Sequence, residues 1–70
     1  MAIRLVLSSG AHRVIENADG ARLDGPFFLV TRSYPELRQV ETVLTLPAKD
    51  VVAAEVLTNG IWTEYVRGEG

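Results

Sequence analysis

The sequence lacks the residues that most often brace a chain this small. It has 70 residues, no cysteine and a single histidine, His12. Disulfides are therefore excluded, and one imidazole cannot build a structural zinc site. A domain of this length buries only about 60% of the surface of its unfolded chain. Because 47% of the residues are hydrophobic and the mean hydropathy is +0.13, we expect self-association or a protein partner to cover the surplus apolar surface.

An excess of positive charge and long apolar runs are also lacking. The net charge of -2 argues against bulk attraction to nucleic-acid phosphates or to an anionic membrane. The apolar run at residues 1–7 is interrupted by Arg4 and ends at Ser8, too early for a signal-peptide core or a membrane span. We expect a cytoplasmic protein without membrane contact, of the kind found as small accessory proteins in bacteria or their phages.

The strongest local signal that is present is the pair Asn59-Gly60 between two apolar runs. Asn and Gly supply the positive φ angles of a type I′ turn, so the pair predicts a β-hairpin of residues 51–58 and 61–66. The predicted register places Glu55 opposite Glu64 and Ala54 opposite Tyr65. Two facing carboxylates repel, so we expect that face either to be solvated at its middle or to meet a cation or an arginine; the candidates are Arg4, Arg13 and Arg67.

Alternating apolar residues and Asp-Gly turns predict further strands. These are residues 2–8, 12–16, a brief 21–23, 27–32 and 38–46. The last segment has an alternative, because Ser33-x-x-Glu36 matches a helix capping box and favours one helix near residues 35–45. We favour the strand there because Val40, Thr42 and Val43 are β-branched.

The predicted fold is all-β, a small antiparallel barrel or strongly bent sheet of five to six strands, SH3-like in shape. The alternative is an α+β fold that contains the helix near residues 35–45. We expect one domain over residues 1–67 and a frayed tail at residues 68–70.

Groups able to carry out catalysis are few. Ser8 and Ser9 lie close to His12 in sequence, but this spacing is explained by turn preferences and predicts no activated nucleophile. Asn17, Asp19 and Asp24 match no calcium loop. We therefore predict no catalytic residue, no metal site and no cofactor, and do not expect an enzyme.

Two clusters are candidates for binding a partner. Arg32, Tyr34 and Arg38 surround one turn, where arginine forks beside an aromatic ring suit a carboxylate or a stacked base. Trp62 and Tyr65 are aromatic anchors on the last hairpin. The favoured interpretation is a protein-interaction module or oligomeric subunit. The alternatives are a single-strand nucleic-acid binder and, least favoured, an enzyme whose site is shared across an oligomer interface.

Overall fold

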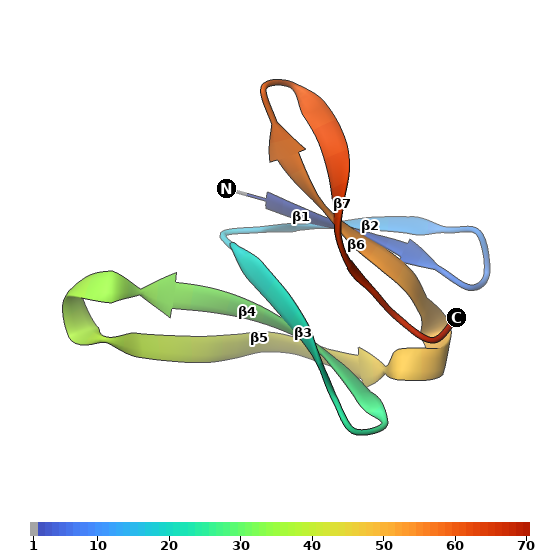
Figure 1. The fold of residues 1–70 in the computed structure, drawn as a ribbon, viewed down its shortest axis with the longest axis horizontal. Helices are drawn as coiled ribbons and strands as arrows, with labels where there is room; N and C mark the ends of the chain where they lie inside the picture. The colour runs from blue at the N-terminus through green and yellow to red at the C-terminus, as the bar shows by residue number, and fades with distance from the viewer. Residues whose placement is uncertain (1) are drawn as a thin grey trace.

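The computed structural model describes residues 2–70, and the fold is two antiparallel β-sheets (Figure 1). The four-stranded sheet has the order β2-β1-β6-β7 and the three-stranded sheet has the order β3-β4-β5. The strands are β1 Ala2–Leu7, β2 His12–Glu16, β3 Gly20–Asp24, β4 Phe27–Tyr34, β5 Gln39–Pro47, β6 Val51–Thr58 and β7 Ile61–Arg67. Short 3-10 turns, η1 Pro35–Leu37 and η2 Ala48–Asp50, flank β5.

The core lies between the inner faces of the two sheets. Side chains alternate along each strand, so every second residue of β1 and β4 faces inward. Ile3 and Leu5 of β1 and Phe28 and Val30 of β4 are fully buried there, together with Val51 at the start of β6. This small layer of aliphatic and aromatic side chains holds the sheets together.

The last hairpin forms as its sequence predicts, except at one end. Asn59 and Gly60 have φ angles of 51° and 78°, and Glu55 lies opposite Glu64. Beyond that pair the prediction was wrong, because Ala54 lies opposite Val66 and not Tyr65. A β-bulge between Ala54 and Glu55 inserts one extra residue in β7, which shifts the register.

The alternative helix near residues 35–45 does not form, and the favoured strand does, as β5. Pro35 starts a single 3-10 turn that ends at Arg38, whose φ of 52° is left-handed and incompatible with continuing a right-handed helix. β5 follows directly and pairs with β4 along its whole length. The β-branched residues therefore outweigh the capping-box signal in this segment.

The predicted barrel and strand count also need correction. Among residues 2–70 the strands form two separate sheets and no closed barrel, since β1 pairs with β6 while β3 pairs only with β4. Seven strands form in place of five to six, because both short segments pair as strands: β2 has the predicted bounds and β3 extends the brief segment at 21–23 to five residues. The all-β class and the antiparallel pairing are confirmed.

The tail at residues 68–70, expected to fray, is hydrogen-bonded to the rest of the fold. The backbone N–H groups of Gly68 and Gly70 donate to the carbonyls of Val52 and Val51, at 2.9 and 2.8 Å. Glu69 donates to the carbonyl of Ala48 at 3.0 Å. The tail thus fastens the start of β6. In residues 2–70 we find no helix with the length and apolar character that crossing a membrane requires.

Candidate interaction surfaces

Two hairpins project beyond the core, the β4–β5 hairpin and the β6–β7 hairpin (Figure 1). We call residues 32–42 the arm: the distal part of the β4–β5 hairpin with its turn (Figure 1). β3 accompanies β4 only as far as Gly20, which lies opposite Thr31. A bulge between Val30 and Thr31 bends the hairpin at this point. From Arg32 onward the two strands of the arm therefore pair with each other alone.

Polar contacts along one face stiffen the arm. The Arg32 guanidinium lies 5.0 Å from the centroid of the Tyr34 ring, and the Tyr34 hydroxyl donates to Oε2 of Glu41 at 2.9 Å. The hydrogen bond to Glu41 raises the pKa of Tyr34 above its ordinary value, and the positive charge of Arg32 partly opposes this effect. The structure brings Arg32 and Tyr34 together. Arg38 does not join them, because it closes the turn at the tip of the arm.

Apolar side chains occupy other positions on the arm. Leu37 at its tip and Val40 on β5 are both strongly exposed; the Val40 side chain is 68% accessible. Val40 and Thr42 also line a groove of about 500 Å³ that extends across β3 to Tyr65 of β7. Tyr65, the residue displaced by the β7 bulge, thus forms the far wall of this groove. The arm and β7 share one concave surface.

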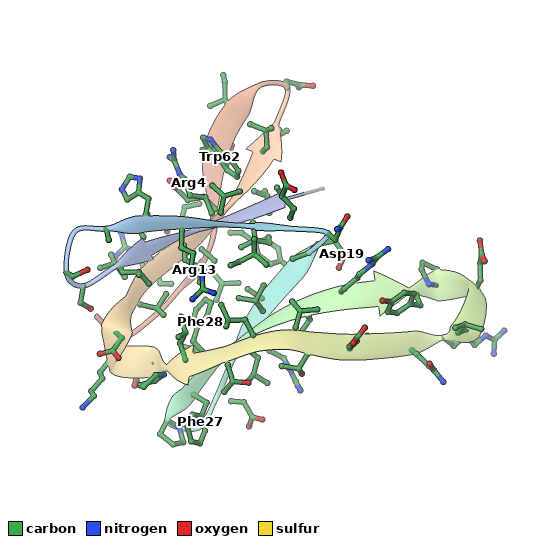
Figure 2. The ribbon with its side chains drawn as sticks, turned by 180° about the vertical axis from the view of Figure 1, so that it is seen from behind. Arg4, Arg13, Asp19, Phe27, Phe28 and Trp62 are labelled. Atoms are coloured by element: carbon green, nitrogen blue, oxygen red, sulfur yellow. The ribbon has the colours of Figure 1, made fainter. Side chains whose placement is uncertain are left out.

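Trp62 belongs to a different surface, the outer face of the four-stranded sheet. Its ring lies under the Arg4 guanidinium, 4.8 Å from centroid to Cζ, and Nε of Arg4 donates to Oε1 of Glu55 at 2.8 Å (Figure 2). Trp62 is half-buried there and lies outside the core. Trp62 and Tyr65, predicted as one cluster, are therefore on separate surfaces.

The prediction that arginine would accompany the two facing carboxylates is confirmed for Arg4 and Arg67. Nε of Arg67 donates to Oε2 of Glu64 at 3.2 Å, so each carboxylate has its own arginine. Arg13 does not take part. It lies opposite Leu5 and points between the sheets, where it lines a smaller groove of about 280 Å³ (Figure 2).

Comparison with known proteins finds no protein-family model, curated protein or solved structure that matches this chain. The geometry of the chain itself must therefore carry any functional proposal.

The serines near His12 have other partners. The Ser8 hydroxyl donates to the carbonyl of Lys49 at 2.8 Å, and the Ser9 hydroxyl accepts a bond from the N–H of Ala11 at 3.3 Å. Asp19 likewise accepts the Ser33 N–H at 3.0 Å, which fixes the base of the arm. Within residues 2–70 no three acidic or imidazole groups gather as a metal site would need.

Sequence reasoning missed Leu37 and Val40 as candidate contact residues. A signal for them was available: the segment predicted at 38–46 is much longer than the neighbouring one at 21–23. A long hairpin beside a short strand must project, and apolar residues in the projecting part have no core to enter. Arg4 was proposed as a partner for the carboxylates but its stacking on Trp62 was not foreseen.

Proposed function

We propose that the protein is a cytoplasmic protein-interaction module or oligomeric accessory subunit without catalytic activity of its own. One observation carries the proposal: exposed large apolar side chains concentrate on two projecting hairpins. Among residues 2–70 these include Leu37, Val40 and Val43 on the β4–β5 hairpin and Leu57, Ile61 and Tyr65 on the β6–β7 hairpin. Each 100 Å² of apolar surface that a partner covers contributes about 2.5 kcal/mol before the costs of association.

The scaffold suits this task. The Asp19 carboxylate holds the base of the arm, while the Arg32–Tyr34–Glu41 contacts restrain it along its length. A rigid recognition element loses less conformational entropy on binding than a flexible loop does. We propose that the bent sheets act as an SH3-like scaffold that presents the two hairpins at fixed positions.

Binding of single-stranded nucleic acid has less support. Stacking of bases needs free aromatic faces beside unpaired cations. Here one face of Tyr34 carries Arg32 and one face of Trp62 carries Arg4, and the charge of Arg4 is neutralised by Glu55. The acidic net charge adds to this disadvantage.

A pair of matched variants tests the proposed function. Val40 on the arm and Val14 on β2 are exposed valines in strands, 68% and 51% accessible. We expect the wild type to bind an apolar-surface dye, Val40→Lys to bind clearly less of it, and Val14→Lys to match the wild type. A wild type that binds no dye and is strictly monomeric by light scattering would contradict the proposal. A salt-dependent change in Trp62 emission on adding oligonucleotides would favour the nucleic-acid alternative.

A further inference from the structure

The two sheets end in four edge strands, which differ in how well they are protected. Exposed edges present unpaired backbone groups, and natural edges are usually short, charged, bulged or covered. β2 has five residues, including the charged Arg13 and Glu16. β3 is equally short and lies beside β7, which carries its own bulge. Each of these three edges therefore has at least one protecting feature.

β5 is the longest edge and carries the fewest charges. It has nine residues, more than any other strand in residues 2–70, and Glu41 is its one charged residue, with Pro47 at its end. Its sequence is otherwise mostly β-branched and apolar, the composition that pairs readily with another strand. A bulge whose extra residue is Val43 itself interrupts the edge at a single point and leaves an extended run on either side.

The two halves of β5 have different surroundings. In residues 44–47, Leu44 and Leu46 are half-buried and pack against the core. In residues 39–42, which belong to the arm, every side chain is exposed and Val40 has no core beneath it. An antiparallel neighbour with the same sequence would place its residues 44–47, which pack against its own core, beside the exposed residues 39–42 of the first copy, and the reverse.

We propose that the β5 edge binds β5 of a second copy of this chain, antiparallel and about a two-fold axis near Val43, the middle residue of the strand. The three-stranded sheets of the two copies then form one continuous six-stranded sheet. The self-pairing rests on the proposed function and specifies its partner.

The charge pattern of β5 is compatible with this arrangement. Like charges directly opposite each other in a sheet are destabilising. Glu41 lies two residues from Val43, so the two copies of Glu41 are offset by four residues along the pairing, about 13 Å at 3.3 Å per residue. Each Glu41 then faces the uncharged part of the other strand around Thr45. Beyond a Debye length, repulsion between exposed charges is largely screened.

A single cysteine tests the pairing, because the chain has none of its own. Near a two-fold axis the Cα atoms of facing residues lie about 4.5–5.5 Å apart, within the range that a disulfide spans. We expect Val43→Cys to form a covalent dimer quickly on mild oxidation. Val14→Cys, an exposed valine on the β2 edge, serves as the control and is expected to crosslink slowly. Equal rates for the two variants would overturn the assignment of the edge.

The solution mass gives an independent measurement. Across a dilution series followed by light scattering, we expect a reversible wild-type dimer, and Val43→Lys should raise its dissociation constant about tenfold or more, since two ammonium groups would face each other. Val14→Lys should leave the constant unchanged. A monomeric wild type, or a dimer that Val43→Lys does not weaken, would overturn the pairing.

The outcomes separate this inference from the proposed function. If the wild type is monomeric and Val43→Cys does not crosslink, but Val40→Lys still lowers dye binding, β5 self-pairing is wrong and the interaction module stands. If dye binding is absent as well, both proposals fail. Crosslinking specific to Val43→Cys together with a concentration-dependent mass supports both.

Discussion

Arg4 lies over the ring of Trp62, with its Cζ 4.8 Å from the ring centroid. The same guanidinium pairs with Glu55, so one side chain covers an aromatic surface and neutralises a carboxylate that faces Glu64 across the hairpin. Without Arg4, this outer sheet face would expose the apolar surface of the tryptophan ring, and the two facing carboxylates would repel each other. Arg4 covers part of the ring and reduces the repulsion, so we assign it a stabilising role.

Replacing Arg4 tests this role. Arg4→Met keeps the aliphatic stem but removes the charge, leaving Glu55 without its partner. The paired side chains are only 26% and 20% accessible, so we expect a loss of about 1 kcal/mol in the free energy of unfolding, at the upper end for a partly exposed pair. Arg67→Met is the control, since that pair with Glu64 is 71% and 49% accessible and should contribute close to nothing. Urea denaturation measures both; equal losses would contradict the assigned role.

Phe27 and Phe28 are adjacent in sequence but differ in environment. Phe28 is fully buried between the sheets, whereas Phe27, the first residue of β4, is 49% accessible (Figure 2). Phe28→Ala should cost about 3–5 kcal/mol through lost burial and the cavity left behind. In a domain this small that loss is enough to unfold much of the population. Phe27→Ala should cost about 1 kcal/mol or less. Thermal unfolding followed by circular dichroism separates the two, and similar melting temperatures would argue against the inward orientation of Phe28.

The sequence was sufficient for local features of this fold. Asn59-Gly60 determines its own turn, and the facing of Glu55 and Glu64 follows by counting from that turn. Electrostatics predicts that the two carboxylates need solvent or a cation such as an arginine beside them. The turn and the facing of the two glutamates depend on residues close in the chain, whereas the arginine that accompanies Glu55 comes from β1 and is placed there by the pairing of distant strands.

The features that could not be predicted depend on distant contacts. β1 pairs with β6 some fifty residues away in the chain, as Arg4 opposite Glu55 shows, and this pairing decides that there are two sheets and no barrel. Tyr65, which the bulge displaces, lines a groove together with residues of β3. Alternation within one strand carries no information about such neighbours, so the bulge and the pairing of Ala54 with Val66 were not available from sequence. The separation of Trp62 from Tyr65 was available, because residues three apart in a strand point to opposite faces.

The docked tail leads to a prediction at Gly68. A Cβ atom there would collide with the carbonyl oxygen of Val51. Gly68→Ala should therefore expel the tail and break its hydrogen bonds to β6, costing about 1–3 kcal/mol. Glu69→Ala, next in the chain, leaves the backbone donors intact and should be nearly neutral. Amide hydrogen exchange of Gly68 and Gly70 together with urea denaturation measures the effect. Rapid exchange of these amides in the wild type would show that the tail is free.

Tyr34 gives the arm a pH dependence. Its hydroxyl must be protonated to donate to Glu41, and this bond raises the pKa of Tyr34 above its ordinary value of 10.0. A pKa that is higher in the folded than in the unfolded state means that the folded state holds the proton more tightly. The stability gained is thus complete below pH 10 and is lost as the pH rises through the folded-state pKa.

Comparing the two tyrosines of the chain tests this assignment. In the wild type, loss of the bond between Tyr34 and Glu41 contributes to destabilisation at alkaline pH. Tyr34→Phe has no such bond to lose, so its free energy of unfolding should fall less than that of the wild type as the pH is raised through 10 and beyond. Tyr65→Phe keeps the bond and should still show this contribution. Phenolate absorbance of Tyr65→Phe, in which Tyr34 is the one remaining tyrosine, should show the pKa of Tyr34 raised above 10.0. If Tyr34→Phe and the wild type lose stability in parallel over this range, the hydroxyl does not donate to Glu41 in solution and the arm lacks that restraint.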